Sequence, residues 1–167
     1  AKADKFGNVV VCKQPSAGRQ RARSVALQGH LDMVCEKNKD KVHDFLKDPI
    51  ELVRKGNLMM ADGTTLGADN GVAVATNLAI MEDRSLEHGP LEFLFTVDEE
   101  SGMTGAKNLE PGFFKGRILL NLDSEDEGIL FIGCAGGLDT VGTMSFRSEP
   151  LPRGSAAFEI SVTGLQG

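Results

Sequence analysis

One histidine and five acids in this sequence stand where side chains can do chemistry. Each follows an apolar run or precedes a helical pattern, so each is expected at the end of a secondary-structure element. These residues are His30, Asp32, Asp69, Glu99, Glu100 and Asp123. Carboxylates gathered in a crevice raise one another's pKa, and a divalent cation removes that repulsion. Neutral imidazole with carboxylates suits Zn²⁺, with Co²⁺ or Mn²⁺ as substitutes.

The elements expected to position these residues alternate between strands and helices. Apolar or β-branched runs typical of strands lie at 8–12, 24–28, 90–97, 117–122, 128–133, 140–146 and 156–162. Helical spacing predicts an amphipathic helix over 71–83 and a short helix over 105–109, and Lys55-Gly56-Asn57 predicts a hairpin turn. The expected fold class is therefore α/β, with a mixed, mainly parallel sheet flanked by helices.

Parallel strands bring their carboxyl ends to one edge of a sheet, where α/β proteins bind ligands. Asp32, two residues after His30, is placed to accept a hydrogen bond from the second ring nitrogen and so orient the imidazole. Glu99 and Glu100 are adjacent and point in different directions, so one can bind metal while the other acts as general base and acid in peptide hydrolysis. Taken alone, His30-x-Asp32 also fits a solvated turn, and the two glutamates also fit a helix cap.

Composition narrows the function classes. A net charge of -6 and a pI near 5.1 argue against a nucleic-acid partner. Neither a membrane-crossing apolar run nor a signal-peptide pattern is found in the sequence, so no membrane partner is expected. Three cysteines without CxxC spacing favour a reducing, cytoplasmic setting over a disulfide framework. Cys35 and Cys134 are expected to be buried, and His43 and His88 to lie at the surface.

The motifs GHLD, GADNG, VDEESGMTGA and NLDSE, in this order, resemble the co-catalytic dizinc exopeptidases, which include carboxypeptidase G-like enzymes, peptidase T and carnosinases. The longer stretches GHLDMVCEKN, TTLGADNGV, DEESGMTGA and GCAGGLDT are more narrowly similar to the aminoacyl-histidine, or Xaa-His, dipeptidases of that family. The resemblance extends over nearly the whole chain. Two alternatives, a serine hydrolase and a nucleotide-binding protein, lack the GxSxG, GxGxxG and P-loop patterns that they need.

This resemblance implies a role for each of the candidate residues. His30, Asp69 and Asp123 would hold one zinc ion, and Asp69 would bridge to a second ion held by Glu100. Glu99 would be the general base. Asp32 would contact His30 on the side away from the metal ion. The resemblance also implies a cis peptide bond between Asp69 and Asn70.

The chain departs from the family pattern in its histidines. In the family, a C-terminal segment gives the second zinc a histidine and the lid domain gives the substrate another, and neither matches His43 or His88. We therefore expect the N-terminal part of a metallopeptidase catalytic domain over 1–136 and strands leading into a truncated lid and dimerisation domain over 137–167. The full-length protein is expected to be a homodimer that binds small dipeptides, and the chain alone to be weakly active at most.

Three functions stay open on the sequence. The first is zinc-dependent hydrolysis of Xaa-His dipeptides such as carnosine, through a water bridging two metal ions. The second is an amidohydrolase that acts on N-acyl amino acids, and the third is a noncatalytic metal-binding or assembly module. Comparing carnosine with N-acetyl-histidine separates the first two, and metal uptake without turnover marks the third.

Overall fold

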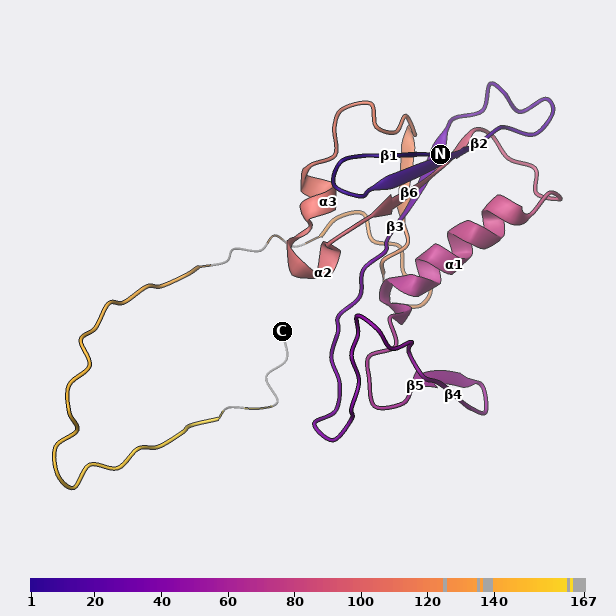
Figure 1. Cartoon of the computed structure of the whole chain (residues 1–167). Helices are drawn as coiled ribbons and strands as arrows, with labels where there is room; N and C mark the ends of the chain where they lie inside the picture. The colour runs from indigo at the N-terminus through magenta and orange to yellow at the C-terminus, as the bar shows by residue number, and fades with distance from the viewer. Residues whose placement is uncertain (125, 135, 137–139, 162, 164–167) are drawn as a thin grey trace. The chain divides into compact units, whose positions relative to one another are not determined.

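The structure is a computed structural model of the chain (Figure 1), and it describes residues 1–124, 126–134, 136, 140–161 and 163. The chain divides into two units, Ala1–Phe131 and Ile132–Gly167, and each is considered by itself. All helices and strands of the described residues belong to the first unit. No helix in the described ranges is long and apolar enough to cross a membrane.

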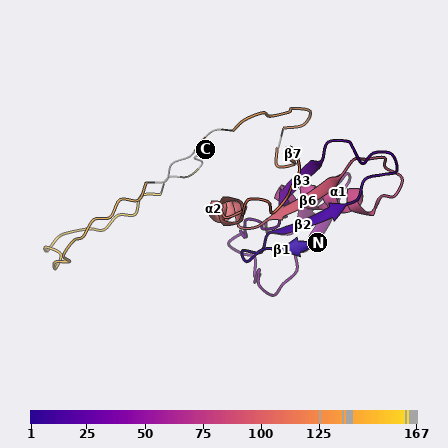
Figure 2. The ribbon, with the colours of Figure 1, turned by 90° about the horizontal axis from the view of Figure 1, so that it is seen from above.

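A five-stranded mixed sheet forms the centre of the first unit. Its strands lie side by side in the order β1 (Lys2–Ala3), β2 (Val9–Lys13), β6 (Leu91–Thr96), β3 (Val25–His30) and β7 (Ile118–Asn121) (Figure 2). β3 pairs in parallel with both β6 and β7, whereas β2 pairs antiparallel with β6 and β1 antiparallel with β2. The mixed α/β sheet is thus confirmed, and its parallel part contains the strand that ends at His30 and the strands that precede the two glutamates and Asp123.

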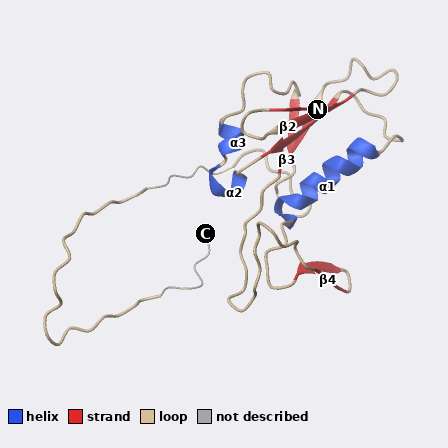
Figure 3. Cartoon of the chain, in the orientation of Figure 1, coloured by secondary structure: helices blue, strands red, loops and turns tan. Residues whose placement is uncertain are grey.

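The helix α1 (Ala68–Glu82) lies along the sheet and packs on β3 (Figure 3). Asp69 and Asn70 have non-helical backbone angles, so the regular helix begins at Gly71, where the sequence pattern begins. Two four-residue helices follow β6: α2 (Glu99–Gly102) and α3 (Thr104–Lys107). The hairpin predicted around Gly56 is present as β4 (Leu52–Lys55) and β5 (Leu58–Ala61), with Gly56 at a φ of +59° that favours glycine.

The core lies on both faces of the sheet because neighbouring residues of a strand point to opposite sides. On the α1 face, Phe93 packs with Leu27 and Phe95, and α1 adds Val74 and further apolar side chains. On the other face, Leu94 packs with Val10 and Phe113. The central strands β2, β3 and β6 therefore lie between two apolar layers.

Three strand predictions are wrong. The described residues of 128–133, 140–146 and 156–162 contain no strand, and position 162 lies outside the described residues. Their apolar side chains are largely exposed, as for Phe146 at 82% and Ile160 at 88%. A strand needs a neighbour that pairs with its backbone and covers one face, and the described residues supply none for these runs.

Two further expectations are also wrong. Cys35 and Cys134 are exposed free thiols, because the loops that carry them offer no apolar layer to cover them. His43 is buried rather than at the surface, since its ring packs edge-on against Phe45 with 4.5 Å between the ring centroids.

Candidate metal centre

His30 is the last residue of β3, and its ring is almost fully buried at 1% exposure. Its Nε2 atom lies 3.0 Å from Oδ1 of Asp69 and 3.4 Å from Oδ1 of Asp123. Asp123 follows the parallel neighbour β7, and Asp69 lies at the start of α1, which packs on β3. The expected convergence of these groups at one sheet edge is present.

Glu100 completes a group of possible metal ligands. One ligand atom each of His30, Asp69 and Glu100 lie within 4.8 Å of one another. The carboxylates of Asp69 and Glu100 are exposed, so an ion can reach them from solvent. One neutral imidazole with several carboxylates is a donor set that fits Zn²⁺ or another first-row divalent ion. Three of the four ligands predicted from the sequence therefore form one group, and the fourth, Asp123, lies beside its histidine.

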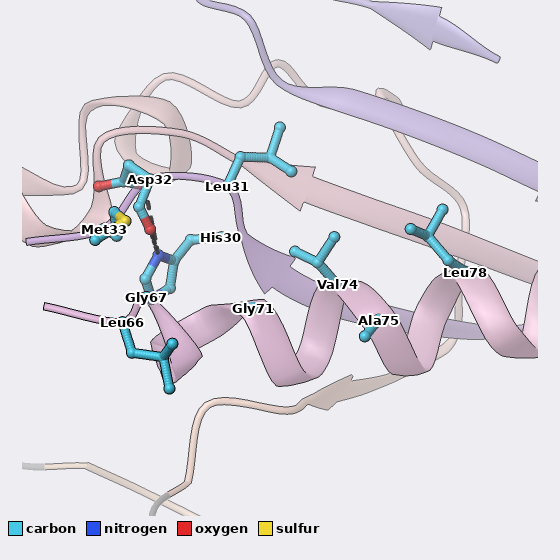
Figure 4. A pocket seen from close by; sticks show the side chains of 10 residues that line it. All are labelled: His30, Leu31, Asp32, Met33, Leu66, Gly67, Gly71, Val74, Ala75 and Leu78. Atoms are coloured by element: carbon cyan, nitrogen blue, oxygen red, sulfur yellow. Dashed lines mark hydrogen bonds and ion pairs between the residues drawn. The ribbon is translucent and has the colours of Figure 1, made fainter. Parts of the chain in front are cut away.

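Asp32 contacts His30 differently from the sequence prediction. Nδ1 of His30 lies 2.9 Å from the backbone carbonyl oxygen of Asp32 and 3.5 Å from its carboxylate Oδ1 (Figure 4). A carbonyl oxygen only accepts hydrogen bonds, so in the neutral ring Nδ1 carries the hydrogen and Nε2 keeps its lone pair. The backbone of Asp32, more than its carboxylate, thus presents Nε2 to the metal position.

The carboxylate of Asp32 instead holds the segment that carries the two glutamates. Its Oδ1 accepts the backbone N–H of Glu99 and its Oδ2 that of Glu100, each at 3.1 Å. Burial opposes ionisation of this carboxyl, but the two N–H donors outweigh it and lower the pKa of Asp32. Asp32 therefore stays ionised and links His30 to the start of α2.

The surroundings shift the pKa of two other groups. Burial disfavours a charged His30 ring, yet its hydrogen bond to the Asp69 carboxylate and the charge of Asp123 prevail and raise the pKa of His30. For Glu99, burial raises the pKa and the neighbouring acids Asp123 and Glu100 add to the rise, against His30. A carboxylate with raised proton affinity suits a general base.

Asn70 belongs to the site although sequence reasoning gave it no role there. The peptide bond between Asp69 and Asn70 is cis, as the resemblance implies. The side-chain Nδ2 of Asn70 donates to Oδ1 of Asp123 and to the backbone oxygen of Leu122 at 3.3 Å. Asn70 thus fixes Asp123 beside His30. Its place directly after Asp69 in GADNG was the one signal available in the sequence.

An apolar pocket adjoins the centre between β3 and α1 (Figure 4). Its apolar walls come from the loops after β3 and before α1 and from α1 itself: Leu31, Met33, Leu66, Val74 and Leu78. His30 and Asp32 line the same pocket. A metal ion at the site would thus have an apolar surface beside it.

Residues 26–158 match the model of peptidase family M20/M25/M40. The chain belongs to this family of peptidases, whose members depend on metal ions. That membership agrees with the donor set gathered around His30.

Curated relatives and solved structures support the assignment. The chain is 46% identical over 164 residues to the cytosol non-specific dipeptidase of Escherichia coli strain K12, covering 98% of this chain and 34% of that protein. Peptidase T of Vibrio cholerae is 32% identical over 104 residues, 59% of this chain and 25% of that protein. The crystal structure of the aminoacylhistidine dipeptidase of Vibrio alginolyticus matches this chain with a TM-score of 0.73 and 50% sequence identity. The match covers 76% of this chain and 26% of that dipeptidase chain. The chain thus spans about a third of the E. coli relative.

Proposed function

We propose that this chain supplies part of the catalytic domain of a dinuclear zinc dipeptidase. The observation that carries this proposal is the grouping of His30, Asp69 and Glu100 at one edge of the sheet, with Asp123 next to His30. In the proposed arrangement, His30, Asp69 and Asp123 hold one ion, and Asp69 and Glu100 contribute to a second. When bound, zinc polarises the scissile carbonyl and lowers the pKa of a water.

Glu99 is the proposed general base. Its raised pKa lets its carboxylate take a proton from the attacking water and pass it to the leaving amine. The backbone N–H groups of Glu99 and Glu100 both bind Asp32, so the two acids have a fixed position relative to His30. Asp32 is the proposed support of this arrangement and takes no proton itself, because its pKa is lowered.

The proposed substrates are dipeptides, Xaa-His dipeptides such as carnosine included. The names of two relatives, a non-specific dipeptidase and an aminoacylhistidine dipeptidase, support this class. We further propose that 1–136 belong to the catalytic domain, that 137–167 lead into a lid and dimerisation domain, and that the whole protein is a cytosolic homodimer. Hydrolysis of N-acyl amino acids is the second candidate, since the same centre would cleave such amides.

The experiment uses a hybrid in which this chain replaces the aligned third of the E. coli dipeptidase. Purified hybrid is assayed with zinc against carnosine, an α-linked Xaa-His dipeptide and N-acetyl-histidine. Glu99→Gln in the hybrid tests the base, because the amide keeps the shape but cannot take the proton. Zinc content is measured in both proteins.

Zinc-dependent cleavage of the dipeptides, lost in Glu99→Gln while zinc is retained, is the expected result. Preference for N-acetyl-histidine would instead make the protein an amidohydrolase. Zinc binding by a folded hybrid that cleaves none of the three would support a noncatalytic metal-binding module.

A further inference from the structure

We propose that Asn8 is a positioning residue for the catalytic turn, defined here as Val97–Gly105, which carries Glu99 and Glu100. Asn8 immediately precedes β2, far from the proposed metal ligands in sequence, and its side-chain hydrogen bonds in the described structure go to Asp4, Val97 and Gly105. Its proposed role is to hold both ends of the catalytic turn through hydrogen bonds to Val97 and Gly105.

Asn8 is fully buried, at 0% exposure, and its side chain bonds to the turn at both ends. Its Oδ1 accepts the backbone N–H of Val97 at 3.3 Å, and its Nδ2 donates to the backbone oxygen of Gly105 at 3.0 Å. The same Nδ2 donates to Oδ2 of Asp4 at 2.7 Å. Each polar atom of the amide is thus used, and two of its three bonds hold the catalytic turn.

Asn8 packs closely against the C-terminal end of the catalytic turn at Gly105. The N–H of Gly105 donates to the oxygen of Val97 at 3.1 Å, which closes the two ends of the turn on each other. A Cβ atom at Gly105 would lie 2.4 Å from Oδ1 of Asn8 and 2.5 Å from the oxygen of Val97. Glycine at this position therefore permits the close approach that the Asn8 amide requires.

The catalytic turn depends on such outside support. Its helix α2 has only four residues and lies between two non-glycine residues with positive φ, Asp98 at 58° and Met103 at 56°. No side-chain cap within the turn stabilises α2 or α3. Asp32 binds the turn on the side of the metal position, and Asn8 binds it at its two ends. These two contacts thus hold the segment that carries both glutamates.

The test compares Asn8→Ala with Asn77→Ala in the 167-residue chain. Asn77 is a matched control because it is also fully buried, while its side chain has no hydrogen-bond partner within the described part of the chain. Amide hydrogen exchange is measured without metal. We expect the amides of Val97, Glu99 and Glu100 to exchange about 3- to 10-fold faster in Asn8→Ala than in Asn77→Ala, the factor of one lost hydrogen bond.

A second variant distinguishes the catalytic turn from the turn before β2. Exchanging the two partners, Asp4→Asn with Asn8→Asp, keeps a donor–acceptor pair between positions 4 and 8 and an oxygen for the N–H of Val97. It replaces the donor to the Gly105 oxygen with a carboxylate oxygen, at a position that is fully buried. Amide exchange across the catalytic turn that is faster in this double variant than in the wild type supports the proposal. The double variant also tests the proposal if Asn8→Ala fails to fold.

Wild-type exchange across Val97–Gly105 in the double variant, or equal exchange in Asn8→Ala and Asn77→Ala, would overturn the proposal. The consequence for metal binding rests on the proposed function, and it predicts weaker zinc binding in the Asn8 variants than in Asn77→Ala. If the wild-type chain binds no zinc, the proposed metal centre fails, whereas the exchange data still decide the role of Asn8.

Discussion

Nε2 of His30 lies 3.0 Å from Oδ1 of Asp69, although the two residues are 39 positions apart. The contact exists because α1 begins directly beside the end of β3. Gly29 makes this possible, since its missing side chain leaves space for Ala73 and Asn70 of α1. The close packing of strand and helix thus sets the spacing of two proposed zinc ligands.

Gly29→Ala should therefore disturb both the fold and the site. The new Cβ would lie 2.7 Å from Cβ of Ala73 and 2.8 Å from Oδ1 of Asn70. We expect the free energy of unfolding to fall by about 1–3 kcal/mol, as in other overpacked cores. Gly71→Ala is the control, because its Cβ would meet nothing within 4 Å and alanine favours a helix. Urea unfolding measures both, and equal stability of the two variants would contradict the proposed packing constraint.

Asp32→Asn should weaken zinc binding, although it substitutes none of the proposed zinc ligands. An amide has one oxygen where the carboxylate has two, so one of the N–H groups of Glu99 and Glu100 loses its acceptor. We expect zinc affinity to fall about 10- to 100-fold, the usual effect of removing a group that supports a ligand. Calorimetric titration with zinc measures this affinity in the wild type and in Asp32→Asn. Asp83→Asn, which alters a carboxylate that accepts the N–H of Ser85 at 2.7 Å, should leave zinc affinity unchanged.

The metal-free chain should lose part of its stability as the pH rises. The folded pKa of His30 is raised above 6.5, because neighbouring carboxylates outweigh the burial of the ring. The protonated ring thus stabilises the fold fully below the unfolded pKa of about 6.5, and this contribution disappears as the pH passes the folded pKa. In EDTA, the stability difference between wild type and His30→Gln should shrink with rising pH. A difference that grows with pH would count against the cluster around His30.

The parallel strands β3, β6 and β7 were predictable from their apolar runs, although only β3 and β6 are buried and β7 is exposed. Their order in the sheet brought His30, Glu100 and Asp123 to one edge, as the motif positions suggested. The runs near Phe146 and Ile160 are also apolar but form no strand in the described structure. An apolar run indicates that a segment can form a strand. Whether it does depends on a neighbouring strand, which the local sequence does not reveal.

The supporting contacts were less predictable than the ligands. Asn8 and Asn70 act through side-chain hydrogen bonds to residues far along the chain, at Gly105 and Asp123. Asparagine commonly marks turns, so its type alone does not distinguish a turn from a buried contact. The spacing of Asp32 from His30 predicts their contact, but the bonds of Asp32 to the backbone of α2 follow only from the fold.

The most direct test of the proposed centre is the zinc content of the 167-residue chain after equilibrium dialysis. His30→Ala removes the buried imidazole of the site, and His43→Ala removes another buried imidazole and serves as the control. The proposed centre predicts at least one zinc ion per chain in wild type and in His43→Ala, and its loss in His30→Ala. A folded wild-type chain without zinc, or a His30→Ala chain that keeps it, would contradict the centre.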